Sequence, residues 1–113
     1  MKKLIIYSFA ILFSESSLIA QCEGRYQTEI FNSVSVTTVN YSDIYNDSYH
    51  SMDIYTPDGD FETNRPVILY MHGGSFYGGN KTMTDCVDFC ENMAKKGYVT
   101  ASLNYRLANI ISF

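Results

Sequence analysis

The feature that most limits how this chain can fold is an apolar run that leads directly into a glycine-rich turn. Residues 67–71 read Val-Ile-Leu-Tyr-Met, with no alternating polar side chains. Such a run is typical of a central parallel strand that is covered on both faces. His72, Gly73 and Gly74 follow at once, and glycine permits a tight turn and a close approach of other groups to the backbone. The segment therefore predicts a buried strand that ends in a turn with an accessible backbone.

A helix and a second strand are expected after this turn. Apolar side chains recur there at helical spacing: Cys86, Val87, Cys90, Met93 and Ala94. Thr82 is the expected N-cap, with Asp85 three residues later as in a capping box. Gly97 can take the left-handed position after the last helical turn. Residues 99–103 form another apolar strand, so the order of strand, helix and strand predicts a βαβ unit.

The residues before the glycine-rich turn predict an antiparallel hairpin. Residues 29–41 are rich in Val and Thr, and residues 49–55 alternate, with Met52 and Ile54 flanking Asp53. Turn-forming residues separate the two runs and close the second one. Alternation indicates strands with one solvated face. The fold class is therefore α/β, with an antiparallel N-terminal hairpin followed by the βαβ unit.

Residues 1–20 read as a secretory signal peptide. A lysine pair precedes an apolar core at residues 4–13, and small residues lead to a cleavage site after Ala20. The apolar core is too short to span a bilayer. We expect this segment to be removed and residues 21–113 to be secreted or periplasmic, with no membrane attachment after cleavage. A lipoprotein with Cys22 as the lipidated residue is the alternative.

Composition argues against one class of function. The chain carries 8 basic and 12 acidic residues, for a net charge of −4. The basic residues form no cluster beyond two Lys-Lys pairs, whereas a nucleic-acid-binding surface needs a basic patch or stripe. We therefore expect no nucleic-acid partner.

The three cysteines, Cys22, Cys86 and Cys90, would meet an oxidising compartment after export. Cys86 and Cys90 share one face of the expected helix. They can be small core residues, or one of them can pair with Cys22. A metal or redox pair is the weaker interpretation, because a structural zinc needs four ligands. We expect no metal ion and no organic cofactor.

Four motifs occur in an order that resembles the N-terminal part of the carboxylesterase and lipase branch of the α/β hydrolases. They are Met52-Asp53-Ile54-Tyr55-Thr56-Pro57, then residues 65–76 around His72-Gly73-Gly74, then Lys96-Gly97-Tyr98-Val99 and Asn104-Tyr105-Arg106-Leu107. The chain resembles in particular secreted bacterial esterases that cut acetyl, feruloyl or similar esters. Four ordered motifs are far more specific than one His-Gly-Gly. The resemblance implies an incomplete α/β-hydrolase sheet within residues 21–113.

The resemblance also implies roles for the residues of the turn. The amides of Gly73 and Gly74, with Ser75, would form the oxyanion hole that stabilises an ester carbonyl under attack. Three residues are expected to support this loop: His72, Tyr105 and Arg106. Two aromatic residues are expected at the lip of the acyl pocket: Phe76 and Tyr77. The implied substrate is a small-molecule or polysaccharide-linked ester.

Other side chains with catalytic chemistry receive structural assignments. His72 is expected to brace the loop, because a general base must reach a nucleophile. Ser75 is not the expected nucleophile, since no G-x-S-x-G surrounds it. Asp53 in its early strand is expected to make a structural hydrogen bond, and His50 is expected to be exposed in mid-strand.

The chain contains no nucleophile elbow, and in this family the Ser, the acid and the His of the triad follow later in the sequence. We therefore expect the N-terminal portion of a secreted serine esterase, which supplies the oxyanion-hole loop and is inactive alone. An open sheet edge would make this portion self-associate. Two alternatives remain. One is a non-catalytic remnant or association module, and the other is the front end of an exported peptidase or lactonase of the same fold.

Overall fold

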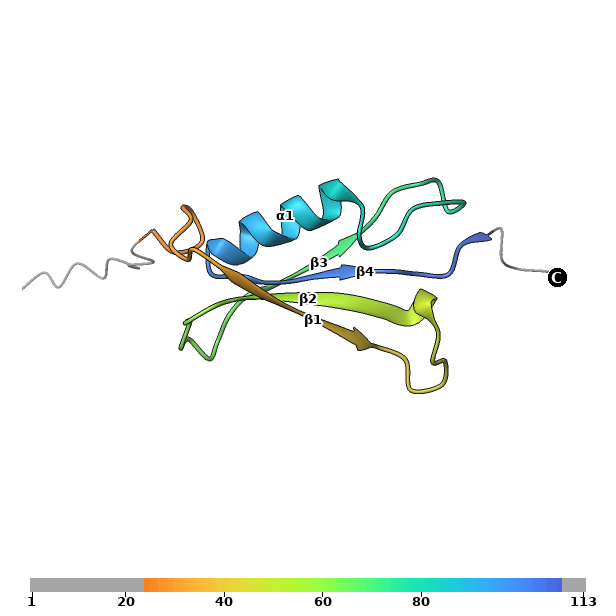
Figure 1. The fold of residues 1–113 in the computed structure, drawn as a ribbon, viewed down its shortest axis with the longest axis horizontal. Coiled ribbons are helices and arrows are strands. Elements are labelled where there is room, and N and C mark those ends of the chain that lie inside the picture. The colour runs from red at the N-terminus through yellow and green to blue at the C-terminus, as the bar shows by residue number, and fades with distance from the viewer. Residues whose placement is uncertain (1–23, 109–113) are drawn as a thin grey trace, which may run out of the picture.

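The computed structural model describes residues 24–108, which form a mixed four-stranded sheet with one helix packed against it (Figure 1). The strands are β1 (Val34–Asn40), β2 (Ser51–Pro57), β3 (Val67–Met71) and β4 (Val99–Leu103). The helix is α1 (Thr84–Lys95), and a short 3-10 turn, η1 (Ser48–His50), precedes β2. This arrangement confirms the α/β class. The expected signal peptide and Cys22 lie outside the described residues.

The strands are ordered β1-β2-β4-β3 across the sheet. β1 and β2 pair antiparallel, from Val34 opposite Pro57 to Asn40 opposite Ser51. β4 then pairs antiparallel with β2 and parallel with β3. The expected hairpin and the expected βαβ unit, β3-α1-β4, are both present. Because β3 and β4 run in the same direction, their carboxyl ends lie side by side.

The core lies between α1 and the sheet. Cys86, Cys90 and Ala94 are fully buried on α1, next to Tyr55 of β2 and Thr100 of β4. The Thr100 hydroxyl donates to the Cys90 carbonyl at 2.9 Å. Burial raises the pKa of Tyr55 to about 12 and also raises the pKa of both thiols. Cys86 and Cys90 are thus free thiols of the core.

The two ends of α1 compare differently with expectation. The N-cap is Met83, which makes no side-chain capping hydrogen bond, so the predicted capping box at Thr82 is wrong. The side-chain oxygen of Asn80 accepts from both the amide and the hydroxyl of Thr82, at 2.9 and 2.7 Å. This local turn draws Thr82 away from the helix. At the other end, Gly97 has the expected left-handed φ of 101°, and its N–H donates to the Ala94 carbonyl at 2.8 Å.

Within residues 24–108, β3 is an edge strand with one covered face, which agrees with the expected open sheet edge, although its apolar run is typical of a strand covered on both faces. Ile68 and Tyr70 lie on the α1 side. Val67, Leu69 and Met71 point the other way and are 61%, 63% and 69% exposed. An unbroken apolar run indicates that every side chain favours burial. It does not specify that residues 24–108 supply a covering layer for each face.

The exposed side of β3 continues as an apolar surface across β4 and β2. The register places Leu69 beside Ala101, which in turn lies beside Ile54. Among the described residues, the only helix covering the sheet, α1, lies on the opposite side (Figure 1). We call this surface the open face, and its side chains are Val67, Leu69, Met71, Val99, Ala101, Leu103, Met52 and Ile54.

Arg25, before β1, bonds to the connections that precede β3 and β4. Arg25 donates to both carboxylate oxygens of Asp60, from Nη1 at 3.1 Å and from Nη2 at 2.5 Å. Nη2 also donates to the carbonyl of Gly97, just before β4, at 3.3 Å. The hydrogen-bonded guanidinium holds the pKa of Asp60 below its usual range. This pair joins the segment before β1 to the connection between β2 and β3.

Candidate functional site

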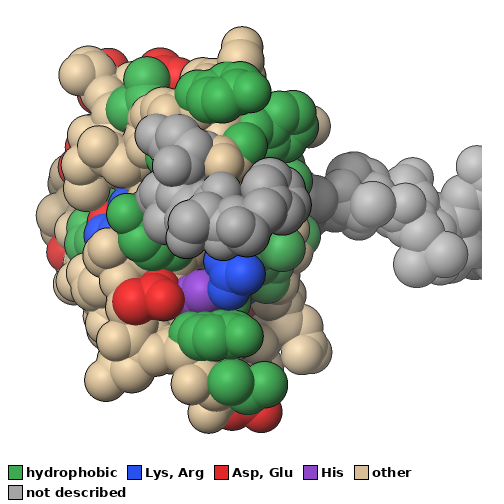
Figure 2. Space-filling model, turned by 90° about the vertical axis from the view of Figure 1, so that its right-hand side faces the viewer, with side chains coloured by type: hydrophobic (Ala, Val, Ile, Leu, Met, Phe, Trp, Pro, Cys, Tyr) green, Lys and Arg blue, Asp and Glu red, His purple; other side chains and the backbone are tan. Residues whose placement is uncertain are grey.

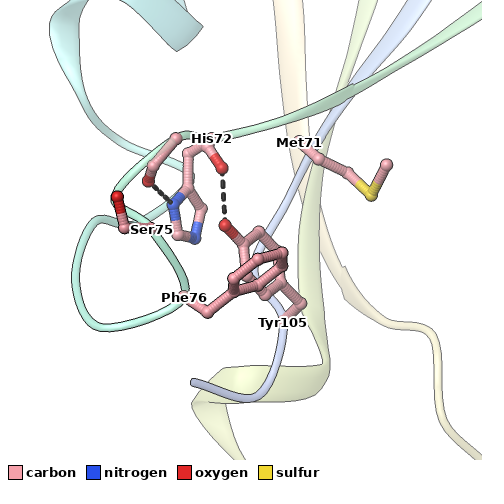
Figure 3. A pocket seen from close by; sticks show the side chains of 6 residues that line it. Met71, His72, Ser75, Phe76 and Tyr105 are labelled. Carbon is pink, nitrogen blue, oxygen red and sulfur yellow. Dashed lines mark hydrogen bonds between the residues drawn. The ribbon is translucent and has the colours of Figure 1, made fainter. Parts of the chain in front are cut away.

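The candidate site lies where the carboxyl ends of β3 and β4 meet. Residues 72–79, which we call the glycine loop, follow β3, and residues 104–107 follow β4. A pocket of 310 Å³ opens between these two segments (Figure 3). In open α/β sheets, ligands bind outside the carboxyl ends of the strands. The pocket is lined by Met71, His72, Gly73, Ser75, Phe76 and Tyr105.

Three consecutive carbonyl groups of the glycine loop are each held by a donor. The Tyr105 hydroxyl donates to the His72 carbonyl at 2.6 Å, and His72 Nδ1 lies 2.7 Å from the Gly73 carbonyl oxygen (Figure 3). Two amides of the following turn donate to the Gly74 carbonyl, at 3.0 and 3.2 Å. Because a carbonyl oxygen can only accept, the contact with Gly73 requires a proton on His72 Nδ1.

The three amides that follow these carbonyls are left without an acceptor. Within residues 24–108, the N–H groups of Gly73, Gly74 and Ser75 donate to no other group of the protein. No peptide bond between the residues that the structure describes is cis, and in a planar trans peptide unit the N–H points away from the C=O. Holding the carbonyls of residues 72–74 therefore also sets the direction of these three amides.

The backbone at the tip of the glycine loop is strained. Ser75 and Phe76 have positive φ values of 53° and 67°, and Gly74 before them has 125°. A non-glycine residue in the left-handed region costs about 1–2 kcal/mol, and such strain is concentrated at functional sites. The Ala108 N–H donates to the Phe76 carbonyl at 2.7 Å, which ties this strained tip to the segment after β4.

The fold requires two glycines of the loop but not the other two. A Cβ on Gly74 would lie 2.0 Å from the Gly78 carbonyl oxygen, and a Cβ on Gly79 would lie 2.4 Å from His72 Nδ1. A Cβ on Gly73 or Gly78 would meet no heavy atom within 4 Å. Gly73 lines the pocket and Gly78 does not. The empty space beside Gly73 is therefore space that a molecule in the pocket can use.

His72 supports the glycine loop from beneath. His72 is buried, with a fractional exposure of 3%. The imidazole stacks on the Tyr105 ring, with 4.3 Å between centroids and 12° between planes. Its Nδ1 is occupied by the Gly73 carbonyl. Buried and bonded in this way, His72 is placed to fix the loop, as is Tyr105.

The remaining predicted site residues are Phe76, Tyr77 and Arg106. The face of the molecule in Figure 2 carries hydrophobic side chains with fewer charged ones among them. Phe76 lines the pocket and is 69% exposed. Tyr77 is also exposed but does not line the pocket. Arg106 packs on Tyr45, in the connection between β1 and η1, with its guanidinium carbon 5.2 Å from the ring centroid.

His50 also differs from expectation, because it ends η1 and is partly buried instead of exposed in mid-strand. Asp47 caps this turn by accepting from the His50 amide at 3.1 Å, and its carboxylate lies 2.7 Å from His50 Nδ1. The imidazole stacks on Tyr45 with 4.9 Å between ring centroids. Because η1, capped by Asp47, occupies residues 48–50, the strand begins at Ser51, two residues later than the alternating pattern predicted.

The hydrogen bonds of the Asn104 side chain were not predicted from the sequence. Its Oδ1 accepts from the Lys81 amide at 2.6 Å, and its Nδ2 donates to the Ser48 carbonyl at 2.8 Å. One side chain thus joins the segment after the glycine loop to η1. The motif Asn-Tyr-Arg-Leu is visible in the sequence, but a motif does not show which distant groups a side chain bridges.

Residues 24–108 hold no cluster of three or more His, Cys, Asp or Glu side chains that could bind a metal ion. The helix of this region is not long and apolar enough to cross a membrane.

The mixed sheet, with its βαβ unit and the glycine loop at the carboxyl end of β3, is consistent with part of an α/β-hydrolase-like fold. A sequence model of the BD-FAE family, a family of α/β-hydrolase-like esterase domains, matches residues 52–113. The match covers more than half of the chain and includes all of β2 except Ser51, the glycine loop and β4. The chain therefore belongs to the BD-FAE family. No curated protein matches this sequence.

Proposed function

We propose that the glycine loop is the oxyanion hole of a secreted serine carboxylic-ester hydrolase. The observation that carries this proposal is the row of three amides, at Gly73, Gly74 and Ser75, which have no acceptor within residues 24–108 while the carbonyls before them are held. Donors of this kind are useful when they are fixed before the reaction begins. Membership of an esterase family supports the same assignment.

The chemistry gives each part of the loop a task. When a nucleophile attacks an ester, the carbonyl oxygen gains negative charge, and N–H groups aimed at it lower the barrier. Successive amides in a tight turn form a concave site that suits an anion. Gly73 leaves free space in the pocket, where the substrate carbonyl must come close. Phe76 and Met71 offer apolar contacts for the rest of the ester.

The sequence limits what this chain does in the reaction. None of the 113 residues forms a G-x-S-x-G elbow, the motif that carries the nucleophile in hydrolases of this fold. We therefore assign the chain the oxyanion-stabilising part of catalysis, and we expect the 113-residue chain alone to hydrolyse no ester. The substrate class is a small-molecule or polysaccharide-linked ester, cleaved without a metal ion or an organic cofactor.

The test begins with the nucleotide sequence beyond the codon for Phe113, read in all three frames. A frame that encodes Gly-x-Ser-x-Gly, followed by an acid and a histidine, gives the protein to be assayed with p-nitrophenyl acetate. In that protein, Gly73→Ala keeps its N–H but places a methyl group in the pocket. Displacing the substrate carbonyl by about 1 Å is expected to lower kcat/KM by about 100-fold. The matched control is Gly78→Ala, which also adds a Cβ in free space but lies outside the pocket.

The control decides the interpretation. Gly78→Ala is expected to retain kcat/KM within about threefold, because it leaves the pocket unchanged. Equal losses in the two variants would refute the oxyanion assignment. The absence of any such frame would refute the serine esterase. A longer protein that cleaves peptides or lactones but not p-nitrophenyl acetate would select the peptidase or lactonase alternative.

Secretion is part of the proposal and rests on the signal-like residues 1–20. Expression of the full chain should yield a mature protein that begins at Gln21. N-terminal sequencing of the exported fraction measures this directly. A chain retained in the cytoplasm with Met1 or Lys2 at its N-terminus would refute secretion.

A second candidate function, an association module, is favoured by one observation. Within residues 24–108, β3 pairs with β4 along one edge only and exposes apolar side chains on the open face, and exposed strand edges pair with other strands. This function predicts a defined oligomer of the 113-residue chain. A heterogeneous aggregate would argue against it.

A further inference from the structure

Lys81 is anchored at three points where the chain leaves the glycine loop. Its Nζ lies 2.5 Å from the Asp53 carboxylate on β2. Its N–H donates to Asn104 Oδ1 at 2.6 Å, and its carbonyl accepts from the Ser102 hydroxyl at 2.8 Å. One residue thus joins the end of the loop to β2, to β4 and to the segment after β4.

The charged part of this anchor is buried. The side chains of Lys81 and Asp53 are 12% and 8% exposed, and lysine is almost never buried without a partner. The second carboxylate oxygen of Asp53 accepts from the Thr38 hydroxyl at 2.6 Å, so the pair is fixed to β1 as well. A buried pair is weak support for stability, because desolvation offsets much of the attraction. Its value lies in fixing one geometry.

The anchor is mechanically close to the proposed oxyanion hole. Gly79, two residues before Lys81, runs so near the start of the loop that an added Cβ would lie 2.4 Å from His72 Nδ1 and 2.5 Å from the Gly73 carbonyl oxygen. These two groups form the hydrogen bond that sets the direction of the Gly74 amide. A shift of the chain at residue 81 therefore reaches this bond through direct backbone contact.

We propose that Lys81, through its ion pair with Asp53, is a positioning residue that holds the glycine loop in its oxyanion-binding shape. The inference rests on the proposed function for its catalytic meaning, whereas the mechanical role is a property of this chain alone. Asp53 thereby gains a role beyond the structural hydrogen bond expected from its sequence position.

The test is hydrogen–deuterium exchange of the full 113-residue chain, read by mass spectrometry on peptides. One peptide group covers residues 76–83, which include the amides that donate to the Gly74 carbonyl, and another covers residues 87–95 of α1. Lys81→Met is expected to speed exchange at least about tenfold in residues 76–83, with α1 unchanged, because local opening does not require global unfolding. Lys96→Met is the matched control, since its side chain makes no ion pair among the described residues.

Lys81→Met leaves Asp53 buried without a partner. If this unfolds the chain, a double variant still gives a decisive test. Lys81→Met with Asp53→Leu removes both charges, a change that is often neutral for stability. The proposal expects near-native α1 protection and persistently fast exchange in residues 76–83. Native protection in residues 76–83, or equal acceleration across all peptides, would overturn it. Neither readout uses an ester, so failure of the proposed activity would appear only in the hydrolysis assay.

Discussion

Gly74 is the residue of the glycine loop whose substitution should damage the fold most clearly. Its φ of 125° is one that L side chains rarely adopt, and a Cβ there would lie 2.0 Å from the Gly78 carbonyl oxygen. The obstacle is backbone, so a rotamer change cannot relieve it. Gly74→Ala must therefore move the turn by more than about 1 Å to restore ordinary contact. That movement breaks the bonds from two amides to the Gly74 carbonyl, which are 3.0 and 3.2 Å long.

The expected loss of stability combines these terms. A sparsely populated backbone conformation costs about 1–3 kcal/mol, and each hydrogen bond contributes about 1 kcal/mol. We expect Gly74→Ala to lower the free energy of unfolding by about 3 kcal/mol, which corresponds to a fall in Tm of roughly 15 °C for a domain of this size. Gly73→Ala should be neutral or stabilising by about 0.4–1 kcal/mol, since its Cβ meets nothing.

Thermal unfolding followed by far-UV circular dichroism measures both variants, because the chain has no tryptophan to report by fluorescence. Gly78→Ala serves as a second control, as it shares the free space found at Gly73. A Tm for Gly74→Ala within about 3 °C of the wild type would refute the reasoning. So would a Gly73→Ala variant that melts as early as Gly74→Ala.

Three further predictions concern other parts of the molecule. Arg25 lowers the pKa of Asp60, so the pair stabilises the fold above the ordinary Asp pKa of about 4, and this stabilisation is lost as the pH falls through the lowered pKa. Asp60→Asn should therefore reduce the difference in Tm between pH 6 and pH 3. An unchanged difference would contradict this. In a Cys22→Ser variant, the two buried thiols of α1 should react with a thiol reagent at least about tenfold faster in denaturant than in buffer, whereas equal rates would show that they are accessible. Leu69→Lys on the open face should reduce self-association, measured by light scattering, whereas Phe61→Lys, at an exposed site in the connection between β2 and β3, should not. Equal effects would exclude association through the open face.

Much of the fold could be predicted because its signals are local. The helical recurrence of Cys86, Cys90 and Ala94 reports a buried stripe, and these residues are indeed the core of α1. Gly97 is recognisable as a helix end because only glycine adopts a left-handed φ without cost. The strands were identified by their β-branched and apolar runs. Such patterns depend on neighbours in the sequence, and they survive in three dimensions.

The errors arose where distant or competing contacts decide. Thr82 resembles an N-cap, but the side chain of Asn80 binds it in a separate turn. The apolar run of β3 shows a preference for burial and says nothing of which element supplies the cover. The pair of Lys81 with Asp53 joins positions 28 apart in the sequence, and no local pattern announces it.

The candidate site divides in the same way. The glycines and the histidine of the loop are visible in the sequence, and so is Tyr105. The left-handed φ values of Ser75 and Phe76 are not, because neither residue type favours that conformation. They are imposed by contacts such as the bond from Ala108 to the Phe76 carbonyl, which form only when the segment after β4 is in place.

The strand order β1-β2-β4-β3 has a consequence for how the chain assembles as it is made. β2 and β3 are consecutive in the sequence but are not neighbours in the sheet, because β4 lies between them. During synthesis from the amino end, the β1–β2 hairpin can form early, whereas β3 has no neighbouring strand to pair with until β4 has been made. The four-stranded sheet can therefore form only after residues 99–103 have been made. The pocket needs Tyr105 as well as the glycine loop, so it comes into existence only after that point.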